Sequence, residues 1–150
     1  TLFGAGTDSG TFDYFTAAIN GEEGASRTDY SPSEDDNVTV QGVASEKGAL
    51  GYFGLSYAEE NADKLVAAQV DNGKGCVTPS VETVQSGEYA PLSRPLFIYV
   101  ANKAYAEKAE VKSFVDYFVA NSEATAKAAG FVSLTAEQQK TATDELASIK

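Results

Sequence analysis

The sequence predicts an α/β fold, because segments typical of strands alternate with segments typical of helices along the chain. Hydrophobic residues make up 43% of the 150 residues, which is enough to bury the core of a domain of ordinary size. The run Leu96–Val100 is continuously apolar and β-prone, as expected of a buried strand. A turn of small polar residues at 7–10 leads directly into apolar residues at helical spacing.

The first 33 residues contain a strand, a helix and a loop, predicted at 1–6, about 11–20 and 21–33. The helix has an apolar face at i, i+3, i+7 spacing, formed by Phe12, Phe15 and Ile19. Asn20-Gly21 is a usual helix stop. The loop that follows is predicted to be exposed.

A second helix is predicted to begin at Ser33 and to run to about Ser45, with Ser33 as its N-cap. Glu34, Asp35 and Asp36 then fall in the first turn, where the helix dipole favours negative charge. Three consecutive acids also suit a metal site, but dipole compensation and solvation explain them more simply.

The middle of the chain alternates again, with strands predicted at 49–55 and 64–70, helices at 56–63 and 79–84, and a turn at 73–75. Pro79 and Ser80 suit the start of the second of these helices, since proline is tolerated in a first turn.

After the strand at 96–100, helices are predicted at 107–121, 123–129 and 135–149, the second of them stopped by Gly130. The first is expected to bury its apolar residues, which are Val111, Phe114, Val115 and Phe118. In the last, Thr135 and Gln138 form a capping-box pattern. A weak boundary at 86–91 separates two well-patterned halves.

Charge and composition exclude several classes of function. The net charge of −11, from 22 acidic and 11 basic residues, argues against general nucleic-acid binding and against docking on anionic lipid. It still permits an anionic ligand held locally by amides and hydroxyls. The chain has no histidine and one cysteine, which excludes the usual zinc sites and Ser-His-Asp or Cys-His catalysis. Cys76 is expected to be a small buried thiol.

No stretch approaches 18 apolar residues, so no membrane span is predicted. The chain contains no methionine and no signal-peptide pattern. Thr1 is therefore not expected to be a translational start, and we expect the chain to be a processed or trimmed piece of a longer protein.

Ser9, Gly10 and Thr11 form the first candidate site, at the predicted N-terminus of the helix at 11–20. Unpaired N–H groups and the positive end of the dipole meet there, and two hydroxyls beside a glycine suit a small oxyanion. The same residue types are also ordinary N-caps of helices that bind nothing, which is their commoner use.

Several segments together resemble one family. The first is Thr7-Asp8-Ser9-Gly10-Thr11-Phe12-Asp13-Tyr14-Phe15. It is followed, in the expected order, by Gly24-Ala25-Ser26-Arg27 with Asp29-Tyr30, Ser33-Glu34-Asp35-Asp36-Asn37, Gly48-Ala49-Leu50-Gly51-Tyr52-Phe53-Gly54 and Pro91-Leu92-Ser93-Arg94-Pro95-Leu96-Phe97-Ile98-Tyr99-Val100. This ordered set resembles the substrate-binding protein of the Pst-type phosphate ABC transporter over residues 2–134.

The resemblance implies a type II periplasmic binding protein fold, in which two α/β lobes close on phosphate at a hinge. Matched to that plan, residues 1–90 are lobe two, with the phosphate loop and an α/β core. Residues 91–150 are the hinge return and the C-terminal part of lobe one. The family's chain is about twice as long, so the N-terminal half and its phosphate ligands are missing. That half is an expected partner, in the same polypeptide or as a separate chain.

The resemblance assigns phosphate binding to Ser9, Gly10 and Thr11. Asp8 adjoins them as a further candidate, although a cap or a partner of an arginine suits it better than a ligand. Many relatives have an arginine four residues before this serine, where this chain has Ala5.

Arg27 is the candidate replacement for that arginine, because its planar fork pairs two phosphate oxygens. The alternatives are an exposed loop arginine or a salt bridge to Asp13. Arg94, in the hinge-return segment, is expected to have a structural role between its flanking prolines.

The expected function is therefore binding of inorganic phosphate outside the cytoplasm and its delivery to an ABC transporter permease, with no catalytic residues, metal or other cofactor. Two alternatives remain open. One is a phosphate-monoester hydrolase with Ser9 or Thr11 as nucleophile and a base or metal supplied by the absent half. The other is a scaffold with the same fold that binds no ligand.

Overall fold

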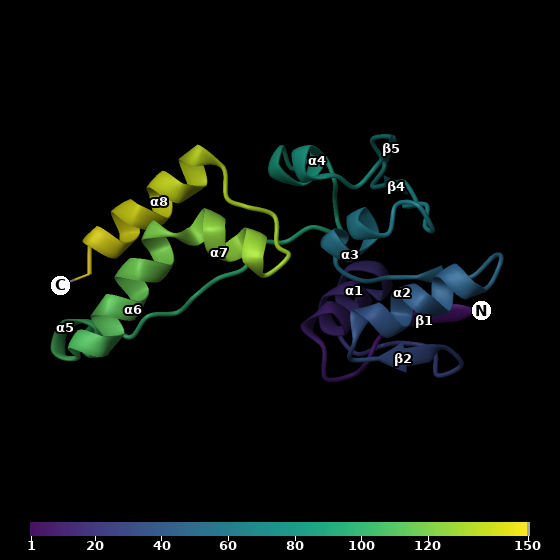
Figure 1. Ribbon diagram of the computed structural model, residues 1–150, viewed down its shortest axis with the longest axis horizontal. Coiled ribbons are helices and arrows are strands. Elements are labelled where there is room, and N and C mark those ends of the chain that lie inside the picture. The colour runs from purple at the N-terminus through teal and green to yellow at the C-terminus, as the bar shows by residue number, and fades with distance from the viewer. Residues whose placement is uncertain (150) are drawn as a thin grey trace. The chain divides into compact units, whose positions relative to one another are not determined.

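The computed structural model describes residues 1–149, which divide into two compact units. Unit 1 is Thr1–Ser93 and unit 2 begins at Arg94. Unit 1 contains β1 (Leu2–Ala5), α1 (Gly10–Asn20), β2 (Ser31–Ser33), α2 (Asp36–Ser45), β3 (Leu50–Gly51), α3 (Leu55–Glu60), β4 (Val70–Asp71), β5 (Cys76–Val77) and α4 (Val81–Gln85), as Figure 1 shows. Unit 2 contains α5 (Asn102–Glu107), α6 (Ala109–Ala120), α7 (Ser122–Ala128) and α8 (Ala136–Ala147).

The centre of unit 1 is a parallel three-stranded sheet in the order β2-β1-β3. Ala5 lies opposite Ser33, and Phe3 lies opposite Gly51. The carboxyl ends of β1 and β2 therefore meet at one edge. In open α/β sheets ligands bind at this edge, at the place where the strand order reverses. In the order β2-β1-β3, the chain first moves from β1 to β2 on one side and then crosses β1 to reach β3 on the other side. The strand order therefore reverses at β1.

The two helices α1 and α2 pack against opposite faces of β1. The neighbouring strand residues Phe3 and Gly4 point to opposite faces and so distinguish the two sides. On one side the Phe3 ring lies so close to Gly42 of α2 that a Cβ there would be 2.3 Å from it. On the other side the Tyr52 ring covers Gly4 and stacks on Phe15 of α1, with ring centroids 3.9 Å apart. The predicted α/β class is confirmed in this unit.

Two threonines are the most buried polar residues of unit 1, each with 1% of its surface exposed. The Thr16 hydroxyl on α1 donates to the Phe12 carbonyl at 2.8 Å and accepts the N–H of Gly24 at 2.8 Å. The Thr39 hydroxyl on α2 has no hydrogen-bond partner among residues 1–149. Thr16 therefore ties α1 to the loop that leads to β2, whereas Thr39 only packs.

Tyr14 connects α1 to the end of unit 1. Its hydroxyl lies 2.5 Å from the carbonyl oxygen of Pro91 and 3.1 Å from that of Ser93. The Ser93 hydroxyl in turn donates to the Tyr89 carbonyl. The last residues of unit 1 are therefore held to the first helix of the same unit.

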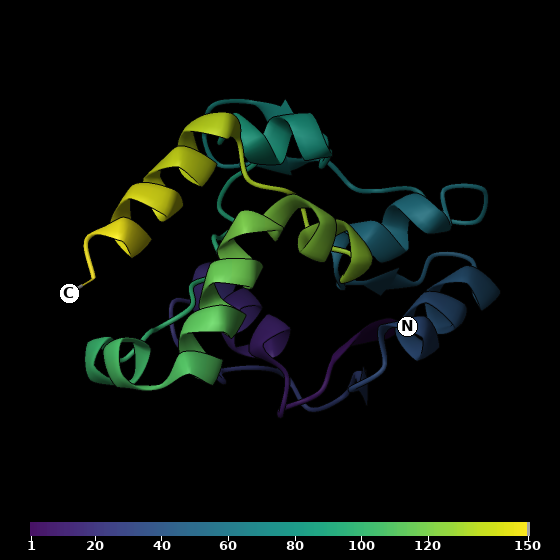
Figure 2. The ribbon, with the colours of Figure 1, turned by 60° about the vertical axis from the view of Figure 1, so that its left-hand side comes forward.

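Unit 2 is helical throughout its regular structure, and α6 contacts α5, α7 and α8 (Figure 2). Tyr105, Val115 and Val119 form its buried cluster, against which Ala142 and Leu146 of α8 pack. Thr135 caps α8, and the Thr135 N–H donates to Oε1 of Gln138 at 2.9 Å. The predicted capping box is thus confirmed.

Several helix predictions are also confirmed. Helix α1 ends at Asn20, and Gly21 follows in the left-handed conformation with φ 79°. A short helix also follows Pro79-Ser80, but it begins at Val81 with Ser80 as its N-cap, so Pro79 lies outside its first turn. Ser33, however, is not the cap of α2: the cap is Asp35, whose Oδ1 accepts the N–H of Asn37 at 2.9 Å, because Ser33 still belongs to β2.

Two predicted strands are wrong. Residues 64–69 are not part of a sheet. A turn follows α3 instead, in which the N–H groups of Lys64 and Leu65 donate to the Asn61 carbonyl. Val66, which the strand would have buried, is 97% exposed. Residues 96–100 form no strand in the described structure. Their side chains are largely exposed, with Tyr99 at 93%, since the described residues of unit 2 contain no strand to pair with them.

Three predicted core residues are exposed. Ile19 is 50% and Phe114 is 67% exposed, because each helix buries a narrower stripe than its apolar residues cover. Cys76 is also exposed, contrary to the expected buried thiol. It lies in the β4–β5 hairpin opposite Asp71, and a two-stranded hairpin has too few neighbours to cover both its faces.

Candidate functional site

The first candidate site lies where β1 passes into α1. Ser9 is the N-cap of α1, with an extended backbone at φ −97° and ψ 128°. Its Oγ accepts the N–H of Thr11 at 3.2 Å, and its own N–H bonds the Gly6 carbonyl at 3.1 Å. Gly10 and Thr11 are exposed at the helix start. A serine hydroxyl that accepts still has one proton to donate, so this end of α1 is suited to a small anion.

Asp8 is not the cap of α1, since Ser9 takes that position. The Asp8 backbone N–H donates to Oε1 of Glu34 at 3.3 Å. Glu34 directly follows β2, so this contact joins the loops that leave two adjacent strands. Asp8 was also a candidate partner of an arginine, but Arg27 pairs with the carboxylate of Asp29 instead.

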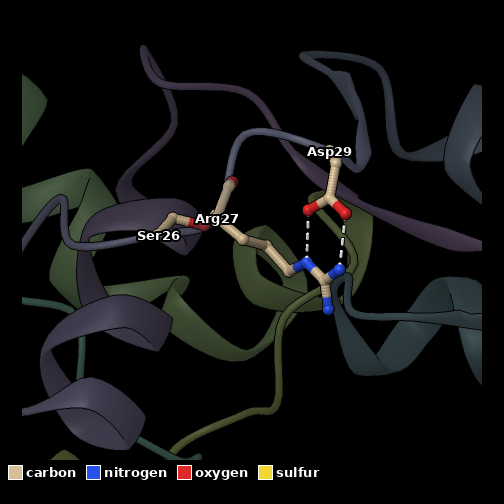
Figure 3. Close-up of polar contacts among 3 residues, drawn as sticks. All are labelled: Ser26, Arg27 and Asp29. Atoms are coloured by element: carbon tan, nitrogen blue, oxygen red, sulfur yellow. Dashed lines mark hydrogen bonds and ion pairs between the residues drawn. The ribbon is translucent and has the colours of Figure 1, made fainter.

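Arg27 forms a two-pronged ion pair with Asp29 rather than with Asp13 (Figure 3). Its Nε lies 2.5 Å from Oδ1 and its Nη2 2.6 Å from Oδ2 of the same carboxylate. These hydrogen bonds lower the pKa of Asp29 and raise the pKa of Arg27. The third nitrogen of the guanidinium points away from Asp29 (Figure 3).

A pocket of about 450 Å³ lies beside these loops. It is lined by Gly6, Thr7, Phe12, Gly24, Ser26, Arg27, Thr28, Tyr30, Pro32, Ser33 and Glu34. Of the residues predicted from the sequence as ligands, Arg27 alone is among this lining. Ser9, Gly10 and Thr11 are not part of this lining, although Gly6, Thr7 and Phe12 on either side of them in the chain are.

Sequence reasoning missed two residues of this pocket. The Tyr30 hydroxyl donates to the Ala5 carbonyl at 2.9 Å, and burial, followed by the charge of Glu34, raises the pKa of Tyr30. Glu34 was interpreted only as an acid in a helix first turn. Both residues flank β2, whose pairing with β1 places them near the end of β1, and this pairing was not predicted from the sequence because 21–33 was expected to be a loop.

Other candidate features bear less on this site. Among residues 1–149, no group of three or more His, Cys, Asp and Glu residues is arranged to hold a metal ion. Arg94 is the first residue of unit 2, and its expected structural role stays a prediction. None of the described helices is both long and apolar enough to cross a bilayer.

The fold is that of part of a periplasmic binding protein domain. Residues 1–123 match the family model described as the PBP superfamily domain, and the chain therefore belongs to this superfamily. Its α/β content is that of part of a periplasmic binding protein fold, which confirms the family predicted from the ordered segments.

Two curated proteins are similar to this chain over most of its length. It is 52% identical over 136 residues to Protein SphX of Synechocystis, which covers 91% of this chain and 40% of that protein. It is 34% identical to the phosphate-binding protein PstS of Staphylococcus haemolyticus, over 99% of this chain and 45% of that protein. The chain thus spans less than half the length of these curated relatives.

One solved structure is also similar. It is the crystal structure of a possible phosphate binding protein from Planctomyces limnophilus, with a TM-score of 0.82 and 40% sequence identity. The match covers 98% of this chain and 52% of that one. PstS is thus named as a phosphate-binding protein, and the Planctomyces limnophilus protein as a possible one.

Proposed function

We propose that this chain is the C-terminal half of a protein that binds inorganic phosphate outside the cytoplasm and delivers it to an ABC transporter permease. The observation that supports this most is the capped N-terminus of α1, which lies at the carboxyl edge of a parallel sheet beside an arginine-containing pocket. The names of the relatives support phosphate as the ligand, and their greater length supports a missing half.

In this proposal Ser9, Gly10 and Thr11 donate to phosphate oxygens from the start of α1. Arg27 adds its guanidinium from the adjoining pocket, already oriented by Asp29. Asp8 belongs to the same loop and lies next to the proposed ligands. Its backbone N–H does not bind phosphate in this proposal, because it donates to Glu34.

The proposed division of the chain follows the family plan, with residues 1–90 as lobe two and residues 91–150 as the hinge return and part of lobe one. The absent N-terminal half then forms the opposing wall of the cleft. Phosphate stabilises the closed form because it touches both lobes, and no step of this function requires a cofactor.

Phosphate titration by calorimetry tests the ligand assignment, in the protein that joins this chain to its N-terminal half. Each hydrogen bond to a charged group is worth about 1.5–3 kcal/mol, so Ser9→Ala and Thr11→Val should each weaken binding roughly 10- to 150-fold. Ser80→Ala is the matched control, since Ser80 is also an N-cap, of α4, and does not line the pocket.

Unchanged affinity in both Ser9→Ala and Thr11→Val would refute the assignment of this loop. A wild-type protein that binds no phosphate would instead favour the scaffold. Turnover of a phosphate monoester that is lost in Ser9→Ala would favour the hydrolase.

A further inference from the structure

The Glu34 side chain reaches from the end of β2 to the loop after β1. Its Oε1 accepts the N–H of Asp8 at 3.3 Å. The same carboxylate lies against Gly6, where an added Cβ would be 1.9 Å from Oε1 and 2.6 Å from Cδ. The absence of a side chain at Gly6 is therefore what allows Glu34 to reach Asp8.

The main chain beside Glu34 holds the same loop. The N–H of Gly6 bonds the Ser33 carbonyl at 2.9 Å, which extends the β1–β2 pairing by one residue. The Gly6 carbonyl then accepts the N–H of Ser9 at 3.1 Å. Gly6 and Asp8 are thus fixed from β2, and Ser9 is fixed through Gly6.

The negative charge of Glu34 is unfavourable for a pocket that is proposed to receive an anion. A carboxylate that lines the same pocket as Arg27 repels an incoming anion, and it occupies a loop N–H that would otherwise be available to that anion. Electrostatics alone would favour a neutral residue here. The geometry instead gives Glu34 a role in holding the loop.

We propose that Glu34 is a positioning residue for the phosphate loop: its carboxylate holds the Asp8 amide and packs on Gly6, and so fixes Ser9 at the start of α1. Glu34 itself does not touch phosphate. This inference rests on the proposed function, but it concerns the state of the loop before phosphate arrives, and that state can be measured without phosphate.

The first test compares two substitutions in the protein that contains both halves. Glu34→Ala removes the acceptor and should weaken phosphate binding roughly 3- to 10-fold, as expected for one lost hydrogen bond. Glu34→Gln keeps an oxygen that can accept the Asp8 N–H, and it should restore binding to within about twofold of wild type. Glu59→Ala, an exposed acid on α3, is the control for loss of one negative charge.

A double-mutant cycle with Gly6 separates this contact from a general loss of stability. Gly6→Ala should weaken binding in the wild-type background, because its methyl group displaces the carboxylate. In the Glu34→Ala background the methyl group has room, and the same substitution should have little further effect. Gly6 is not among the glycines with positive φ, so alanine fits its backbone.

Hydrogen exchange of the Asp8 amide, measured by NMR without phosphate, is the readout independent of function. It should quicken in Glu34→Ala while the urea midpoint of unfolding stays unchanged. Unchanged exchange and affinity in Glu34→Ala, additive effects of Gly6→Ala and Glu34→Ala, or equally tighter phosphate binding in Glu34→Ala and Glu34→Gln would each overturn the proposal. If the wild type binds no phosphate, the proposed function fails and the exchange measurement alone decides the role of Glu34.

Discussion

The two buried threonines of unit 1 allow a matched test of how polar groups contribute to its stability. Thr16 and Thr39 are equally buried, at 1% exposed, and each lies on a helix that packs on the sheet. Replacement by valine keeps the branched shape and exchanges the hydroxyl for a methyl group. The two hydroxyls differ in their partners, so the same substitution should have opposite effects at the two positions.

At Thr16 the hydroxyl that valine removes accepts the Gly24 N–H and donates to the Phe12 carbonyl. A donor left unpaired on burial costs about 1–3 kcal/mol, and we expect about 1–2 kcal/mol because water reaches the exposed Gly24. Thr39→Val removes a buried hydroxyl that has no partner among residues 1–149, which should raise the free energy of unfolding by about 1 kcal/mol.

Equilibrium urea unfolding, followed by NMR signals of α1 and α2 amides, measures both changes in unit 1. The two variants should differ by about 2–3 kcal/mol in the free energy of unfolding, a factor of roughly 30–150 in the folding equilibrium. Thr16→Ser, which keeps the hydroxyl, is the control. Equal effects of valine at the two positions would refute the reasoning, since the partners would then not matter.

Two further predictions concern the β4–β5 hairpin. The N–H groups of Gly75 and Gly73 donate to Asp71 and lower its pKa below the ordinary 3.8, so the hairpin should be supported above pH 3.8 and lose that support as the pH falls through the lower folded value. The amide shifts of both glycines should therefore titrate in this acid range and stay flat in Asp71→Asn; flat wild-type shifts would contradict the contact. Cys76 is exposed, so a disulfide-forming reagent should modify it nearly as fast in the folded protein as in urea, and strong protection would contradict its exposure.

Local signals predicted the helices well, because caps and stops act within a few residues. Thr135 was identified as an N-cap from its own neighbours, and Gly21 as the stop of α1. The strand at 96–100 could not be predicted in the same way. An apolar, β-prone run becomes a strand only when another strand pairs with it, and the described part of unit 2 contains helices alone as regular elements.

In the candidate site, too, the features set by local sequence were predicted and those set by strand pairing were not. The position of Ser9 at a helix start follows from a short motif, and the structure confirms the cap. A salt bridge of Arg27 to Asp13 was one alternative, but Arg27 pairs with Asp29, which lies two residues away in the same loop and suits the planar fork. The reach of Glu34 to Asp8 depends on the pairing of β1 with β2, which separate segments of sequence do not reveal.

Tyr14 gives helix α1 a second attachment whose consequence is mechanical. Its ring lies four residues after Gly10, about 6 Å along the axis at 1.5 Å per residue, and its hydroxyl meets the carbonyls of Pro91 and Ser93. The chain therefore leaves unit 1 from an anchor on the same helix that begins at Ser9. Position 14 lies only about one helical turn from the capped end of α1, so a single short helix carries both the candidate anion-binding end and the attachment of the last residues of unit 1.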